Sequence, residues 1–211
     1  MSQWTVRGIV LWLGLMAICG LCLIESDARA YPEPAIVSMS WEFGVKIGEP
    51  GFIKIKSPGD IDPKLYFYVP YTVTNNTPKE RLFVPGITMT TDAGDLIDAG
   101  RGVAPSVYDR LKRHLRNDLL ENPAQVVDRL LVGNDNARDS IAVWEMPTHD
   151  IDEVRIFFGG LSGETQEVEH PITGERILLR KTLMLDYDTP GSTPNAARKK
   201  IKLREKTWVM R

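Results

Sequence analysis

Short runs of alternating apolar and polar residues, separated by turn-forming residues, cover most of the chain after residue 35 and restrict it to a mainly β fold. Leu65–Thr74 is the clearest run, because it is rich in aromatic and β-branched residues. Further runs that predict strands are 36–43, 52–56, 81–91, 141–144, 154–158, 166–168 and 177–187. Strands and helices do not alternate regularly, as a parallel sheet would require. We therefore expect an antiparallel β-sandwich of the immunoglobulin-like type.

The turn after the Leu65–Thr74 run predicts a hairpin. Asn75–Pro78 contains turn-forming residues, and 81–91 would return along the first strand. Pro70 and Pro85 interrupt the two runs. Since proline lacks a backbone donor, both positions are expected at sheet edges or bulges.

One region of the chain has helical rather than strand periodicity. Ser106 can cap a helix in which Val107, Leu111, Leu115 and Leu119 recur every four residues. Asn122–Pro123 can start a second helix that ends at Gly133. The sequence thus predicts a short two-helix insertion at about 105–132. Tyr66, Phe67 and Tyr68 alternate across their strand, so the outer face of this strand needs a cover, and the helices are the internal candidate.

The first thirty residues have the composition of an export signal. A weakly basic start precedes an apolar stretch, Gly8–Ile24, and Ala28 and Ala30 form a small-x-small cleavage site before Tyr31. We expect residues 1–30 to be removed by cleavage and the protein to reach the periplasm or cell envelope; retention as an N-terminal membrane anchor is the alternative. Cys19 and Cys22, the chain's two cysteines, lie in this segment. The mature chain would then hold no disulfide and no thiolate site.

Charge is uneven along the remaining chain. We expect one domain at 31–195 and a basic C-terminal tail at 196–211, which holds seven lysines or arginines and a single glutamate. Such a tail is typically solvated, or makes electrostatic contact with a membrane or an acidic polymer. The body of the domain is acidic, so nucleic acid is not an expected partner.

Motifs for catalysis, metals and cofactors are weak. Gly160–Glu164 resembles a serine nucleophile elbow, but its fifth residue is glutamate and the run after it predicts a strand. Acidic groups at 134–139, 92–98 and 149–153 offer oxygen or imidazole ligands but lack the spacing of calcium or zinc motifs. We expect them to form turns; weak calcium binding is the alternative. The predicted protein is not an enzyme and has no cofactor and no metal site.

The candidate ligand-binding residues are aromatic. Tyr66, Tyr68 and Tyr71 lie on one strand, where they could contact a small ligand or a glycan.

Several stretches resemble a known family. Leu65–Thr77 resembles the strand and turn of immunoglobulin-like modules in exported bacterial proteins, and 134–144, 158–164 and 180–187 are similar to those of an uncharacterised exported bacterial family with the same layout. The resemblance covers most of 39–190 and implies no activity. The sequence therefore predicts an exported, non-catalytic binding or structural module of the bacterial cell envelope, with an envelope protein or glycan as partner. The alternatives are a small-ligand or glycan binder, and a hydrolase whose carboxylates are brought together by folding.

Overall fold

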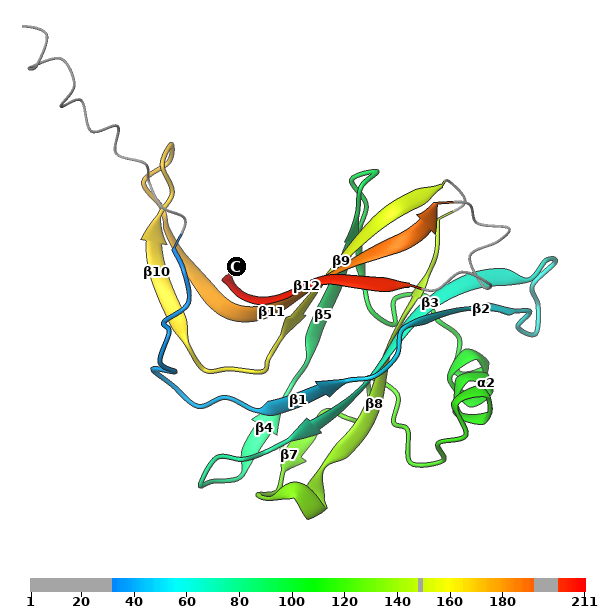
Figure 1. Ribbon diagram of the computed structural model, residues 1–211, viewed down its shortest axis with the longest axis horizontal. Coiled ribbons are helices and arrows are strands. Elements are labelled where there is room, and N and C mark those ends of the chain that lie inside the picture. The colour runs from blue at the N-terminus through cyan, green and yellow to red at the C-terminus, as the bar shows by residue number, and fades with distance from the viewer. Residues whose placement is uncertain (1–31, 148–149, 192–200) are drawn as a thin grey trace, which may run out of the picture. The chain divides into compact units, whose positions relative to one another are not determined.

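Antiparallel strands dominate the structure, a computed structural model that describes residues 32–147, 150–191 and 201–211 (Figure 1). The elements of the unit Pro34–Arg211 are β1 (Gly44–Ile47), β2 (Gly51–Ile55), β3 (Lys64–Thr74), β4 (Arg81–Phe83), β5 (Gly86–Thr91), β6 (Leu96–Asp98), α2 (Pro105–Leu115), β7 (Asp128–Leu130), a 3-10 turn (Asn134–Asn136), β8 (Arg138–Glu145), β9 (Ile151–Gly159), β10 (Thr165–Glu169), β11 (Arg176–Gly191) and β12 (Lys202–Met210). The predicted mainly β class is confirmed. Across the described ranges, no helix is long and apolar enough to cross a membrane.

The smaller sheet is built on β3. It pairs with β8 along one edge and with β1 and then β2 along the other. The partner edge is interrupted between β1 and β2, where the Gly48 N–H donates to the Pro70 carbonyl at 2.7 Å. The N–H and C=O positions of one strand residue face the same edge. The position of Pro70 that lacks an N–H therefore faces the break between β1 and β2. This agrees with the expectation that Pro70 lies at a sheet edge or bulge.

The larger sheet has the order β10-β11-β9-β5-β6, with β12 added to β11. β9 and β10 pair with successive parts of β11, and β12 pairs with residues 181–188. β4 and β7 form a separate pair. All pairings between these strands are antiparallel.

The predicted hairpin of 65–74 with 81–91 is wrong. β4 pairs with β7, and β5 pairs with β9 in the larger sheet. The buried Asn75 explains the departure, because its side-chain amide donates to the carbonyls of Lys79 and Leu130 at 2.8 and 2.9 Å. These bonds hold the turn against β7. Pro85 lies between β4 and β5, where the chain changes sheets.

Buried side chains from both sheets form one core. Its members include Phe67, Val69, Tyr71, Val73, Ala142 and Trp144 from the smaller sheet, and Ile87, Met89, Val154, Ile156, Phe158, Leu183, Leu185 and Tyr187 from the larger.

Helix α2 packs on the opposite face of β3 and β8. Val107, Tyr108 and Leu111 form a second cluster with Tyr66, Tyr68, Ile141 and Val143. The prediction that helical residues cover the outer face of the Tyr66 strand is therefore confirmed. The helix begins at Pro105, with Ala104 rather than Ser106 as its N-cap, and ends before Arg116, which adopts a left-handed conformation (φ 52°). Leu119 consequently lies beyond the helix.

The second predicted helix is absent. Residues 122–127 form turns, and β7 follows them. The Asn122 side chain accepts hydrogen bonds from the N–H groups of Ala124 and Gln125, both at 3.0 Å, which closes a turn. Leu130 then pairs with Arg81 in a strand. Asn-Pro acts here as a turn former rather than as a helix start.

Two terminal segments also differ from their predictions. Residues 36–43 form no strand; they contain a single bridge, Glu42 to Ser162, and Ile36, Val37 and Met39 are exposed. The segment 196–211, predicted as a tail outside the domain, contains β12. Its described part is an integral strand because Trp208 and Met210 bring apolar surface to β11.

Candidate functional site

The three tyrosines predicted to bind a ligand are buried on two different faces of β3. Tyr66 and Tyr68 are 2% and 6% exposed beneath α2, and Tyr71 is 3% exposed in the core between the sheets. The alternation of strand side chains separates them. Burial raises the pKa of all three phenols, that of Tyr71 to about 12. The structure therefore does not bring them together on a surface, and ligand binding by them stays a prediction.

Ala28, Ala30 and Tyr31, the predicted cleavage site, lie outside the described residues.

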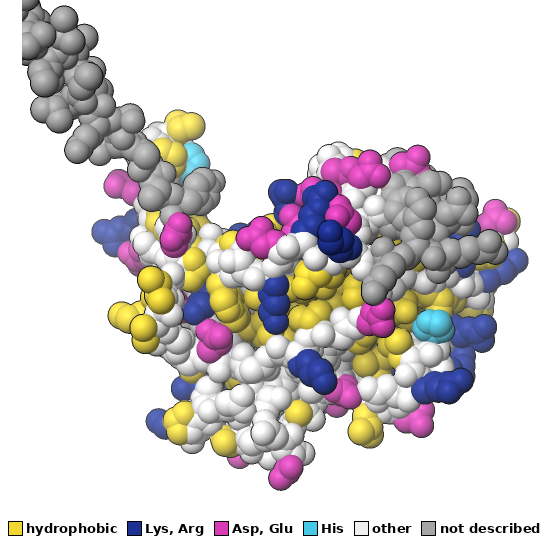
Figure 2. Space-filling model, viewed as in Figure 1, with side chains coloured by type: hydrophobic (Ala, Val, Ile, Leu, Met, Phe, Trp, Pro, Cys, Tyr) yellow, Lys and Arg dark blue, Asp and Glu magenta, His cyan; other side chains and the backbone are white. Residues whose placement is uncertain are grey.

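The candidate binding site is a groove of about 450 Å³ between the two sheets. One wall is formed by β1 and the residues between β1 and β2, and the other by β11 and β12 (Figure 2). The lining residues are Val45, Lys46, Ile47, Gly48, Glu49, Pro50, Tyr187, Ile201, Leu203 and Lys206. Figure 2 shows hydrophobic side chains gathered in this hollow, with cationic side chains beside them. We call it the edge groove.

The edge groove exists because two sheet edges end next to each other. β1 and β12 each pair with one strand only in the described part of the chain. Val45, Ile47 and Ile201 are partly buried and pack against the main core, so the walls of the groove continue the core outward. A mostly apolar concavity with a few polar groups is typical of small-molecule sites.

Tyr187 supplies the polar group on the apolar wall. Its side chain is 2% exposed and packs edge-on against Phe67. Burial raises the pKa of its phenol from the ordinary value of 10.0 to about 12. No hydrogen bond to this hydroxyl occurs among the described residues. The hydroxyl is therefore available to a bound molecule.

Lys206 is the cation on the core-facing side of the groove. It lies opposite Leu185, and cross-strand partners point to the same face of a sheet. Within the described residues, Lys206 makes no ion pair. The neighbouring Arg204 differs, since its guanidinium contacts Glu153 and Asp188, both at 2.6 Å. Lys206 thus keeps an uncompensated positive charge beside an apolar wall.

The other two charged lining residues are Lys46 and Glu49. Lys46 alternates with Val45 and Ile47, which face the core, so its side chain lies on the opposite face of β1. The charge of Glu49 acts on Tyr68, where it adds to the effect of burial in raising the phenol pKa. Tyr68 lies on the face that α2 covers. The charges of Lys46, Glu49 and Lys206 add up to +1, and Lys206 lies on the core-facing side of the groove.

A buried charge cluster lies farther along β11. The Lys181 ammonium is 3.0 Å from a Glu42 oxygen and 3.2 Å from a Glu164 oxygen, and it lies 5.1 Å from the centre of the Trp208 ring. The Ala35 N–H donates to Glu164 at 2.8 Å and is the main cause of the lowered pKa of Glu164. Burial lowers the pKa of Lys181, but the hydrogen bonds with both glutamates outweigh it and raise the value. Each charged group in this cluster has a partner of opposite charge, which indicates a structural role.

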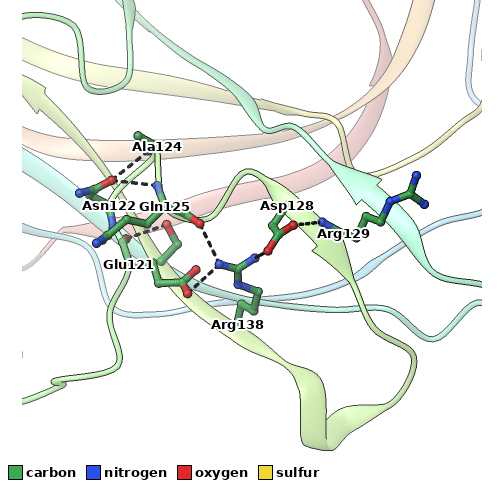
Figure 3. Close-up of polar contacts among 8 residues, drawn as sticks. Glu121, Asn122, Ala124, Gln125, Asp128, Arg129 and Arg138 are labelled. Carbon is green, nitrogen blue, oxygen red and sulfur yellow. Dashed lines mark hydrogen bonds and ion pairs between the residues drawn. The ribbon is translucent and has the colours of Figure 1, made fainter.

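A second polar cluster ties the segment after α2 to β8 (Figure 3). Arg138 donates to a Glu121 oxygen and to the Gln125 carbonyl, both at 2.8 Å, and its other terminal nitrogen lies 3.5 Å from Asp128. The second oxygen of Glu121 is buried without a hydrogen-bond partner. Arg138 lies between the two carboxylates. Each of these carboxylates therefore has the Arg138 guanidinium beside it.

The acidic groups weighed as metal ligands are occupied by turn contacts. Thr91 donates to Asp95 at 2.7 Å, and the Asp152 N–H donates to Asp92 at 3.2 Å. Asp139 accepts from Thr72 and Asn117 at 2.6 and 2.8 Å. In the described ranges no three of His, Cys, Asp and Glu gather as a metal site would require. His149 lies outside those ranges.

Sequence reasoning did not find the edge groove. Its walls come from 45–50, from Tyr187 and from 201–206, and the last segment was assigned to the tail. One signal was available: Ile201 and Leu203 alternate with charged residues, which is a strand pattern. Comparisons of the chain with protein-family models, with curated proteins and with solved structures find no match.

Proposed function

We propose that this chain is a non-catalytic binding module whose ligand occupies the edge groove. The observation that carries the proposal is the groove itself: about 450 Å³ of space whose walls continue the core and are mostly apolar. This volume lies within the range of roughly 300–1,000 Å³ that small-molecule sites have. In finer terms, the scaffold is an immunoglobulin-like sandwich with its open edges used for binding.

The ionic clusters favour binding over bond making. The carboxylates near Lys181 and Arg138 are paired with cations, and neither cluster includes a residue that lines the edge groove. Catalysis by two carboxylates needs an acid and a base on either side of a substrate. The hydrolase alternative therefore gains no support from these contacts.

Binding can be tested with Nile red, a neutral apolar dye. We expect saturable binding to the protein and at least a tenfold weaker affinity for Leu203→Trp, because the larger ring fills the groove. Leu178→Trp is the matched control: Leu178 on β11 is 48% exposed, Leu203 is 45% exposed, and Leu178 lies outside the lining. The control should bind the dye as the unchanged protein does. Absence of saturable binding, or equal loss in both variants, would contradict the proposal.

The module would act after export, in the periplasm or cell envelope, as residues 1–30 indicate. Sequencing of the N-terminus of the protein isolated from cells tests this. Tyr31 as the first residue is the expected result. Met1 on a membrane-bound protein would establish the anchored alternative instead.

A further inference from the structure

We propose that the edge groove takes an anionic amphiphile: a single apolar chain that ends in a carboxylate or phosphate. This inference rests on the proposed binding function and adds the class of ligand. Its two parts correspond to the two features of the groove, an apolar wall and a lysine, Lys206, that has no ion-pair partner in the described part of the chain.

The apolar part follows from the wall. Val45, Ile47, Ile201 and Leu203 offer no hydrogen bonds, so a polar group placed against them would lose its contacts with water without replacement. A hydrocarbon chain has no such loss. It would extend the core between β1 and β12, where Val45, Ile47 and Ile201 already pack against buried residues.

The anionic part follows from the charges on the core-facing side. Lys206 points to this side and has no ion-pair partner among the described residues. The lining also contains Lys46, on the opposite face of β1, and Glu49, and the charges of these three residues add up to +1. An anion beside Lys206 would gain a charge-assisted hydrogen bond.

The Tyr187 hydroxyl provides a second, neutral donor in the same lining. A tyrosine phenol is protonated at physiological pH, and no described residue accepts a hydrogen bond from it. Since no described residue accepts from the phenol or pairs with the lysine, the two groups together favour a ligand head group that only accepts hydrogen bonds. Carboxylates and phosphates have this property.

The test uses calorimetric titration of the mature chain with three probes that share a twelve-carbon tail: dodecanoate, dodecyl phosphate and dodecyltrimethylammonium. Both anions should bind at least tenfold more tightly than the cation. Decanoate should bind roughly 15-fold more weakly than dodecanoate, because each buried methylene contributes about 0.8 kcal/mol. A stronger response to one anion identifies the source, a fatty acid or a phosphorylated lipid.

Lys206→Gln should remove the preference for anions, and Lys202→Gln is its control. Lys202 is an exposed lysine on the same strand, outside the lining. Its substitution should change dodecanoate affinity less than twofold, and thermal unfolding should show that both variants fold.

Three outcomes overturn the inference. Equal binding of the cationic and anionic probes, with Nile red still bound, removes the anionic ligand and leaves the groove as a binding site. Equal losses in the two lysine variants show unspecific attraction to β12. Failure of every probe, Nile red included, removes the proposed function as well.

Discussion

Lys181 shows how a single residue accommodates a charge inside a sheet. It interrupts an otherwise apolar face of β11 and is 4% exposed, yet its ammonium has two carboxylate partners and an aromatic ring within reach. The sequence marks the residue as an exception in the alternating pattern. Its partners could not be predicted, because Glu42 and Glu164 are distant in the chain.

Lys181→Ala should lower the free energy of unfolding by about 3 kcal/mol. The substitution leaves the buried Glu164 carboxylate without its cation, and breaking a buried ion pair in this way typically costs about 3–5 kcal/mol. Urea unfolding measures the change. Lys54→Ala, at an exposed position of β2, is the control and should stay within about 0.5 kcal/mol. A loss below about 1 kcal/mol for Lys181→Ala would show that the pair is not effectively buried.

At the scale of elements, the end of α2 determines which of the regularly spaced leucines are buried. The four-residue spacing predicted Leu111 and Leu119 on one helix face, but the helix ends before Arg116, and Leu119 is 80% exposed. Periodicity indicates that a helix exists better than it indicates where the helix ends, since a left-handed cap can form at a residue such as arginine.

Leu111→Ala should therefore destabilise the protein by about 2–5 kcal/mol, because Leu111 is 0% exposed beneath the helix and its removal leaves a cavity against Tyr68 and Val143. Leu119→Ala should stay within about 0.5 kcal/mol. Chemical denaturation of the two variants separates the outcomes. Equal effects would mean that Leu119 packs as the simple four-residue pattern predicted.

β12 supports a second prediction at this scale. A chain that ends after residue 201 loses the strand that pairs with residues 181–188 of β11 and the contact of Trp208 with the core. We expect loss of a cooperative thermal transition. The full-length double variant Lys202→Gln with Lys206→Gln should keep the transition, because it changes the charge of β12 but not its pairing. An unchanged melting curve for the shortened chain would restore the interpretation of this segment as a tail.

At the scale of the whole molecule, buried phenols link stability to alkaline pH. Burial raises the pKa values of Tyr71, Tyr108 and Tyr187 to about 12, from an ordinary value near 10. Between these values the unfolded chain has lost the phenol protons and the folded chain has kept them, so the unfolded state binds fewer protons and stability falls as pH rises.

We expect stability from these groups to be intact below pH 10 and to decline between pH 10 and 12, where each shift of two pKa units corresponds to about 2.7 kcal/mol. Urea midpoints measured across this window test the expectation. Tyr187→Phe should flatten the slope, since it removes one of the three phenols. A midpoint that does not change up to pH 12 would contradict the buried placement of these hydroxyls.

Strand positions were predictable for β2, β3 and β8 of the smaller sheet and for β9, β10 and β11 of the larger. Alternation with a period of two is a local property, so β2, β3, β8, β9, β10 and β11 follow from their own residues. Residues 122–131 were mistaken for a helix because their apolar spacing suits either structure, and a pairing with β4 decides between them. The candidate tyrosines were identified as aromatic residues of one strand, but their burial depends on α2 and on the opposite sheet.

The amino-acid order is sufficient for the β class, for most strand positions and for the existence of a helix over β3, because each depends on periodicity within a short segment. Folding in three dimensions was needed to establish which strands pair, how Lys181 is neutralised and where the edge groove lies. Those features join residues far apart in the chain: Val45 and Ile47 meet Tyr187 and Leu203 because two sheet edges end beside each other. A local sequence pattern does not predict these contacts, because the contacts depend on how the two sheets pack around their shared core.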